Sequence, residues 1–346
     1  MDDIRAGDAG TLDRNVGSDT VGERAGSENP AKIEGGRGRS AERPSDIPAQ
    51  GWKDILWRVY AGISEDRILA NAAAVTFYAL LALFPGIAAL VSIYGLFADP
   101  ATIQQHLDSI SNILPGGAID VIRDQLERLV AQPRGTLGIS FVVGLVIALW
   151  SANGGIKALF DALNIVYGEK EKRSFVKLNA LTLAFTVAMI GFFIIALACI
   201  VALPVALNYL PGFVGFILNI VRWPVLLVIV ALALACIYRY GPSRDKPKWR
   251  WISWGSAFAA LAWLAFSAIF SFYAAKFGTF NKTYGSLGAV IGFMTWMWLS
   301  VSVILIGAKL NAETEHQTAR DSTEGSPEPM GSRGAKMADS VGPARS

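Results

Sequence analysis

Residues 176–207 read VKLNALTLAFTVAMIGFFIIALACIVALPVAL, and Lys177 is the only charged side chain in this run. A helix rises about 1.5 Å per residue, so about 20 apolar residues cross a hydrocarbon core of ~30 Å. A helix also satisfies its own backbone amide groups, which no water reaches inside a bilayer. The stretch is therefore predicted to be a membrane-spanning helix.

Apolar stretches of this kind recur along the middle of the chain. Hydrophobic residues make up 53% of the sequence and charged residues 17%, against roughly 45–50% and about 25% in ordinary soluble domains. The sequence therefore predicts an all-α integral membrane protein, with a bundle of about six transmembrane helices over residues 68–312. The expected spans are residues 69–97, 136–156, 176–207, 220–240, 251–273 and 287–310.

The two ends of the chain have a different composition. Residues 1–50 and 313–346 are rich in Gly, Ser, Pro and charged residues and contain no Phe, Trp or Tyr. Such segments bury too little apolar surface to offset the chain entropy that is lost on ordering. Both are predicted to be disordered cytoplasmic tails.

Residues 51–67 lie between the first tail and the first span. Their apolar residues follow the spacing of one helical face, and basic residues lie beside that face. The pattern predicts an amphipathic juxtamembrane helix, either lying on the inner membrane surface, which we favour, or packed against the bundle. The apolar positions are Trp52, Ile55, Leu56, Val59, Tyr60 and Ile63, and the basic positions are Lys53, Arg58 and Arg67.

Residues 99–134 form the one sizeable loop expected outside the membrane. Two runs of apolar residues at helical spacing flank Pro115-Gly116-Gly117, which breaks a helix. The pattern predicts a short extracytoplasmic helical hairpin. Whether this hairpin caps the bundle or lies on lipid headgroups stays open.

Lysine and arginine residues near the ends of the spans predict the orientation of the chain. Cytoplasmic loops of membrane proteins carry an excess of these residues. Here they crowd into segments 53–67, 170–177, 239–250 and 309–320 and are sparser in the opposite loops. The N- and C-termini are therefore both expected in the cytoplasm.

Pro85 and Gly86 lie near the centre of the first expected span. Proline lacks the backbone N–H that would bond to the preceding turn, so it commonly kinks a helix. A kink here offers a hinge or a cavity for function. Helix packing alone also explains a proline in a spanning helix and is the more frequent reason.

The strongest polar constellation follows the second expected span. Asn153, Lys157, Asp161 and Asn164 recur at intervals that place them on one helical face. They are candidates for the polar mouth of a pathway for an ion or a polar headgroup, with Lys157 and Asp161 as a charge pair. In the structural alternative, Lys157 extends to the membrane interface and the rest is cytoplasmic helix.

Small residues mark one face of the sixth expected span. Gly285 and Ala289 form one pair spaced four residues apart, and Gly288 and Gly292 form another. Such faces allow two helices to approach closely. These four residues are therefore candidate helix-packing positions.

Catalytic motifs are absent from the sequence. Only two histidines occur, His106 in the outside loop and His316 in the tail, so no histidine cluster is available to hold a catalytic metal. We find no G-x-S-x-G, P-loop or C-x-x-C motif, and the basic residues form no nucleic-acid-binding face. The sequence therefore predicts a protein that is no enzyme and binds no cofactor, metal ion or nucleic acid.

Three blocks of the sequence carry a family resemblance. Residues 72–85 contain AAA and FYALLALFP, residues 150–167 contain WSAN and ALNIVY, and residues 284–313 contain YGSLGA and GAKLNAE. Together they resemble the YihY/BrkB family, also labelled virulence factor BrkB and formerly ribonuclease BN. The resemblance implies a protein of the bacterial inner membrane. Where the family usually has an acid in Gly-Ala-Glu-Leu-Asn, this chain has Lys309, so any charge-specific role of that acid is absent or inverted.

The resemblance and the residues together suggest a function. The family has been linked to serum resistance and to export of lipid or other envelope material, so we expect a transporter or exporter of a lipidic or amphipathic compound. Membrane lipid is then a partner, a homo-oligomer is compatible, and the substrate is not identified. The alternative is a non-transporting scaffold for envelope partners. A ribonuclease, as in the former label, has no support in the residues.

Overall fold

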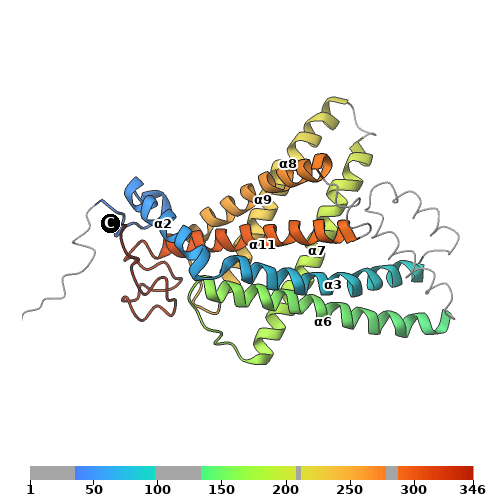
Figure 1. Ribbon diagram of the computed structural model, residues 1–346, viewed down its shortest axis with the longest axis horizontal. Helices are drawn as coiled ribbons and strands as arrows, with labels where there is room; N and C mark the ends of the chain where they lie inside the picture. The colour runs from blue at the N-terminus through green and yellow to red at the C-terminus, as the bar shows by residue number, and fades with distance from the viewer. Residues whose placement is uncertain (1–35, 98–133, 208–211, 278–286, 346) are drawn as a thin grey trace, which may run out of the picture.

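A computed structural model describes residues 36–97, 134–207, 212–277 and 287–345 of the chain (Figure 1). Helices account for most of these residues, and no strand occurs among them beyond one isolated bridge between Pro247 and Thr323. The predicted all-α fold is confirmed. In chain order the elements are η1 (Pro44–Asp46), α2 (Ala49–Glu65), α3 (Ile68–Phe97), α6 (Arg134–Val166), α7 (Phe175–Leu207), α8 (Gly212–Tyr240), α9 (Trp249–Phe277) and α11 (Leu287–Glu315).

Five of the helices in the described ranges are long and apolar enough to cross a membrane. The sixth long helix, α3, is apolar over Ile68–Ala82, and the side chains farther along it lie outside the described residues. All six coincide with the expected spans, although α6 continues well past the expected end at residue 156. The apolar stretches are Val142–Val166, Phe175–Phe192, Trp223–Tyr240, Trp249–Tyr273 and Val290–Glu315.

Large apolar side chains remain exposed along these helices. Val146 is 59% exposed, Val187 55%, Leu261 56% and Ile269 65%. A soluble protein rarely exposes so much contiguous apolar surface. Lipid tails are as apolar as leucine, so these faces are compatible with hydrocarbon around the bundle. The exposure therefore agrees with a membrane-embedded bundle.

One end of the bundle, which we call the polar end, gathers the described loops. There α3, α7 and α9 begin, and α6, α8 and α11 end (Figure 1). Both α2 and the segment 316–345 lie at this end. The polar end therefore combines parts of the chain that are far apart in sequence.

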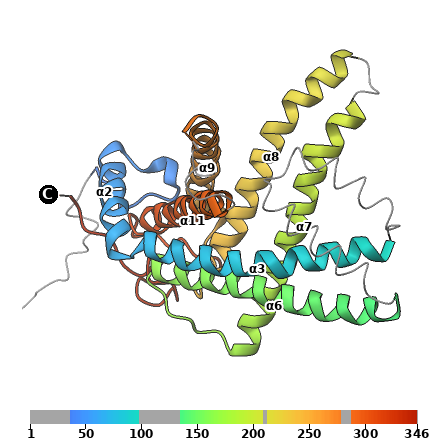
Figure 2. The ribbon, with the colours of Figure 1, turned by 45° about the vertical axis from the view of Figure 1, so that its right-hand side comes forward.

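The helices leave the polar end in different directions. α3 and α6 lie side by side in both views, while α7 and α8 cross them steeply (Figures 1 and 2). Gly155 of α6 faces the backbone of α3, because an added Cβ would lie 3.6 Å from the Ala79 nitrogen. The two helices are therefore neighbours at Gly155, where an added Cβ would make an ordinary van der Waals contact.

A close helix crossing joins α9 to α11 at Gly255 and Gly307. A Cβ added at Gly307 would lie 2.7 Å from the Ala259 Cβ and 2.8 Å from both the Gly255 oxygen and the Tyr238 hydroxyl. At Gly292, by contrast, an added Cβ would meet no atom of the described residues within 4 Å. Among the described residues, α11 therefore approaches α9 closely at Gly307, a position outside the expected packing pairs.

The segment after α11 corrects the predicted disordered tail over residues 313–346. Residues 313–315 complete α11, and residues 316–345 fold onto the polar end with Gln317, Thr318 and Arg333 buried. Composition predicts disorder because these residues have little apolar surface. Hydrogen bonds hold them instead, since Arg333 donates to the carbonyl oxygens of Glu328, Ala338 and Ala319.

The described part of the N-terminal tail, residues 36–50, is also packed rather than disordered. Arg39 is 5% exposed and donates hydrogen bonds to the carbonyl oxygens of Gln317 (3.3 Å) and Gly342 (2.8 Å). The two chain ends therefore hold each other at the polar end. Residues 1–35 of this tail, and the predicted hairpin over 99–133, lie outside the described residues.

α2 has the amphipathic character expected of residues 51–67. Ile55 and Val59 are buried and pack with Trp251 and Leu310 in an apolar cluster. The opposite side of the helix is exposed, and Tyr60 there is 77% exposed. One face of α2 therefore packs on the bundle, while the other still presents apolar side chains outward.

Candidate functional site

For the expected hinge and most of the expected packing residues, the structure describes the helix backbone but not the surroundings of the side chains. Pro85 and Gly86 lie inside α3, which continues as helix through both positions. Gly288 and Ala289 lie in the first turn of α11. The side-chain surroundings of these four residues, and Gly285 itself, are outside the described residues. The hinge and this part of the packing face stay predictions.

The four polar residues of α6 are not brought together into one site. Asn153 is 5% exposed, and its side-chain oxygen has no hydrogen-bond partner among the described residues. Lys157 is half-buried, with its ammonium 5.7 Å from the ring centroid of Trp150. Asp161 is exposed. Over the described ranges Lys157 and Asp161 form no ion pair, so the expected charge pair is not seen.

Asn164, the fourth of these residues, ties two loops of the polar end together. Its amide nitrogen donates to Glu171 at 3.1 Å, and its side-chain oxygen accepts from the backbone N–H of Ser243 at 2.7 Å. Arg173 donates to both carboxylate oxygens of Glu171 at 2.7 Å. These bonds from Arg173 lower the pKa of Glu171 to about 2, although burial opposes the shift. Asn164 is therefore an anchor between loops.

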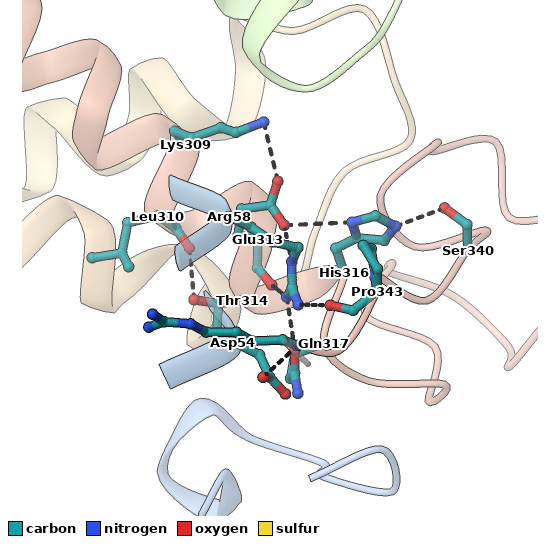
Figure 3. Close-up of polar contacts among 12 residues, drawn as sticks. Asp54, Arg58, Lys309, Leu310, Glu313, Thr314, His316, Gln317, Ser340 and Pro343 are labelled. Carbon is teal, nitrogen blue, oxygen red and sulfur yellow. Dashed lines mark hydrogen bonds and ion pairs between the residues drawn. The ribbon is translucent and has the colours of Figure 1, made fainter. Parts of the chain in front are cut away.

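A buried group of charges joins α2 to the end of α11 (Figure 3). The Arg58 Nε donates to Glu313 at 2.6 Å, and the two side chains are only 6% and 5% exposed. Lys309 contacts the other Glu313 oxygen at 3.0 Å and Asp66 at 2.8 Å. Two cations thus neutralise two carboxylates, which is the condition for keeping charges away from water.

Lys309 occupies the position where the resemblance leads one to expect an acid. Its side chain lies against Gly62 of α2, where an added Cβ would collide with it. Burial raises the pKa of Asp66, and the neighbouring ammonium of Lys309 opposes that rise. The lysine therefore fixes α2 and the start of α3 to α11 through charge and close packing.

A pocket of about 280 Å³ opens beside this group of charges. His316 lies on its wall, with Nδ1 3.4 Å from Glu313 and Nε2 3.1 Å from the Ser340 hydroxyl (Figure 3). The C-terminal segment supplies Lys336, Ser340 and further wall residues. In the part of the chain that the structure describes, no group of three His, Cys, Asp or Glu side chains is placed to hold a metal ion.

A larger pocket at the polar end, which we call the basic pocket, has a volume of about 610 Å³. The start of α7, the end of α8, the loop before α9 and Gly334 of the C-terminal segment enclose it. Six of its lining side chains are basic and one is acidic. They are Lys172, Arg173, Lys177, Arg239, Arg244 and Lys246, with Asp245 as the acid.

Ion pairs reduce the charge of the basic pocket without cancelling it. Four of the six basic side chains pair with glutamates outside the lining. Lys177 and Lys246 form no ion pair among the described residues, and both are exposed. The pairs are Lys172 with Glu169, Arg173 with Glu171, Arg239 with Glu324 and Arg244 with Glu315.

Arg244 is the most deeply buried of these cations. Its side chain and that of Glu315 are both 0% exposed, and its Nη2 donates to both carboxylate oxygens at 2.7 and 2.9 Å. The guanidinium also stacks on Tyr167, 4.6 Å from the ring centroid. Its Nε and Nη1 have no hydrogen-bond partner among the described residues. Part of its donor capacity therefore remains unused.

The basic pocket has only an indirect signal in the sequence. Segments 170–177 and 239–250 were identified by their basic residues, but only as markers of orientation. Both segments lie on the same predicted side of the membrane, so their proximity was open to inference. The pairing of Arg58 with Glu313 and of Arg244 with Glu315 had no signal, because each pair is distant in sequence.

Known proteins share sequence similarity with most of this chain. The family model described as virulence factor BrkB matches residues 59–330. The chain is 28% identical over 249 residues to the "Putative ribonuclease-like protein YfkH" of Bacillus subtilis, covering 70% of this chain and 88% of that protein. It is 25% identical over 283 residues to a UPF0761 membrane protein of Pseudoalteromonas translucida, covering 79% and 89%. No solved structure matches.

Proposed function

Since the chain belongs to the virulence factor BrkB family of bacterial membrane proteins, we propose that it is a transporter or exporter of a lipidic or amphipathic envelope compound. The basic pocket of about 610 Å³ carries this proposal. An amphipathic compound needs a polar site for its head and an apolar surface for its tails. The polar end of this bundle borders exposed apolar helix faces, so the two lie next to each other.

α7 shows this combination within a single helix. Lys177 in its first turn lines the basic pocket. The neighbouring Val176 is 76% exposed, and Val187 farther along is 55% exposed. Such a helix can guide a molecule whose head stays in the pocket while its tails follow the apolar face. This arrangement supports movement along the outside of α7 rather than through a closed channel.

The direction of movement follows from the orientation of the bundle. We place the polar end and both termini on the cytoplasmic side of the inner membrane, because the loops at this end hold the excess of Lys and Arg. The basic pocket then opens toward the cytoplasm. A compound made inside the cell would enter there, which is the direction of export.

Reconstitution into lipid vesicles tests the proposal. We expect the protein to move fluorescently labelled phosphatidylglycerol between the two leaflets faster than protein-free vesicles do. Asn153→Leu should slow this movement, because it removes a buried polar group of α6, and Asp161→Ala should also slow it. Unchanged movement in both variants would exclude these residues from the mechanism. Absence of movement for anionic and zwitterionic lipids alike would contradict transport.

A non-transporting scaffold is the second candidate. The close crossing of α9 and α11 at Gly255 and Gly307 favours it, because an added Cβ at either glycine would collide with the other helix. A scaffold predicts no lipid movement in vesicles. It also predicts that envelope proteins cross-linked to the full chain in cells are lost when the segment 318–346 is removed.

The name of one relative also calls for a test of ribonuclease activity. We propose that this chain does not cleave RNA, since no group of three His, Cys, Asp or Glu side chains in the described ranges is placed to hold a catalytic metal ion. The purified protein with Mg²⁺ should leave RNA intact, and His316→Ala should behave like the unmodified chain. Metal-dependent cleavage that is lost in His316→Ala would contradict this proposal.

A further inference from the structure

We infer that the basic pocket is a binding site for a phosphate group, carried by a lipid headgroup or free in solution. The inference deepens the proposed function, on which it rests for the biological role of the site, by naming the chemical class of the ligand. It assigns binding to Arg244 and Arg239 in the buried wall and to Lys177 and Lys246 at the rim.

Two arginines that line the pocket have N–H donors without a hydrogen-bond partner among the described residues. Arg244 is 0% exposed in its side chain, and its Nε and Nη1 have no partner among the described residues. Arg239 is 4% exposed, and its Nε also lacks a partner there. Buried donors without an acceptor are unfavourable. An anion that enters the pocket supplies the missing acceptors once a shift of these two side chains uncovers the nitrogens, which are covered in this structure.

The chemistry of these donors favours phosphate over a single carboxylate. A guanidinium presents several N–H groups in a planar fork, which matches the multiple oxygens of a phosphate. Aromatic rings hold both arginines in place, with Trp249 4.5 Å from the Arg239 guanidinium and Tyr167 4.6 Å from that of Arg244. The rings therefore keep both guanidiniums at the wall of the pocket, which limits the side-chain freedom that binding must remove.

The pocket keeps a positive charge after its four ion pairs are taken into account. Lys177 and Lys246 line it without an ion pair among the described residues, and Asp245 is the one acid in the lining. Neither lysine has its charge neutralised by a carboxylate there, although the Lys246 ammonium lies 5.2 Å from the ring centroid of Tyr240, so both can attract an anion. Basic residues near an anionic membrane surface each contribute about 1 kcal/mol to such attraction. The rim lysines thus supply attraction, and the buried arginines supply directed hydrogen bonds.

Binding measurements on the full chain in detergent test the site. The probes are dihexanoyl phosphatidylglycerol, dihexanoylglycerol, which lacks the phosphate, and inorganic phosphate. We expect phosphatidylglycerol to bind and dihexanoylglycerol to bind much more weakly. The double variant Lys177→Gln/Lys246→Gln should weaken phosphatidylglycerol binding roughly thirtyfold, which corresponds to about 1 kcal/mol for each lysine. Both lysines are exposed and form no ion pair among the described residues, so we expect this variant to keep the fold.

A matched control removes two positive charges elsewhere. Lys53→Gln/Arg250→Gln changes two exposed residues outside the basic pocket and should leave binding unchanged. Equal binding of both lipids, or equal weakening in both double variants, would overturn the inference. Competition by inorganic phosphate identifies the source of the ligand. Tighter binding of free phosphate than of phosphatidylglycerol supports the site with phosphate as its ligand, and the reverse supports a headgroup.

The same variants separate this inference from the proposed function. If labelled lipid moves across vesicles equally fast in Lys177→Gln/Lys246→Gln and the unmodified protein, while neither binds phosphate, the inference fails and transport stands. If the unmodified protein binds the phosphate group but moves no lipid, the site stands and transport fails.

Discussion

Lys309 pairs with one carboxylate on its own helix, α11, and with another in the turn between α2 and α3. It lies between Asp66 and Glu313, at 2.8 and 3.0 Å, with its side chain only 7% exposed. An acid at this position would face two carboxylates in a setting with little water. The lysine that stands in place of the expected family acid therefore matches the two carboxylates beside it. The sequence alone does not reveal these partners.

Charge reversal tests this coupling. Lys309→Glu should destabilise the protein by about 3–5 kcal/mol, because it removes one partner of a buried pair and adds repulsion. Thermal unfolding in detergent measures the effect, with Lys53→Glu on the exposed side of α2 as the control. The double variant Asp66→Lys/Lys309→Glu should recover part of the loss. A melting temperature of Lys309→Glu equal to that of the unmodified protein would contradict the role of the lysine.

The lowered pKa of Glu171 predicts that the stability of the protein depends on pH. Its pKa is lowered from 4.5 to about 2 by the bonds from Arg173, so the folded state favours the carboxylate. Its contribution is complete above pH about 4.5 and is lost as the pH falls toward about 2. The difference in melting temperature between Glu171→Gln and the unmodified chain should therefore shrink over this range. Glu42→Gln, at an exposed position, should show no such trend, and a difference that is constant with pH would refute the assignment.

At the scale of elements, helix packing shows what the sequence does and does not reveal. The length and apolar character of each span depend on local composition, so all six helices were predicted. The contact between α9 and α11 depends on which glycines face each other, which is a property of the pair. Gly292 belongs to a regular small-residue pattern, yet Gly307 makes the close approach.

Alanine at each of these two glycines tests the crossing. Gly307→Ala should destabilise the protein by about 1–3 kcal/mol, because its Cβ would crowd Ala259 and the hydroxyl of Tyr238. Gly292→Ala should be neutral or slightly stabilising, since alanine favours a helix and nothing lies within 4 Å. Thermal unfolding compares the two, and an equal effect would contradict the assigned crossing.

The C-terminal segment differs most from its prediction, because the contacts that hold it come from residues far away in the sequence. Composition detects apolar surface, whereas Arg58 and Arg39 hold the segment through the carbonyl oxygens of Pro343 and Gly342. Removal of residues 318–346 should lower the melting temperature by about 5 °C or more, because these buried cations lose acceptors. Ser326→Ala, at an exposed position of the segment, serves as the control. An unchanged melting temperature after truncation would support a disordered tail.

At the scale of the whole molecule, the sequence supplies the membrane bundle and the family, and the structure adds the polar end. The candidate residues Asn153, Lys157, Asp161 and Asn164 came from helical spacing, which correctly puts them on α6 but does not tell which partners they meet. Asn164 bonds to two loops, and Asp161 stays exposed. The basic pocket requires loops from three parts of the chain, which spacing along one helix cannot reveal.

Both proposals depend on one arrangement, in which the helices cross the membrane and leave the polar end in the cytoplasm. Cysteine labelling in spheroplasts tests it most directly, in a background where Cys199 and Cys236 are alanine. A membrane-impermeant maleimide should label Phe213→Cys, at the far end of α8, in intact spheroplasts. It should label Lys246→Cys, at the polar end, only after the membrane is opened. Labelling of Lys246→Cys in intact spheroplasts would contradict the account.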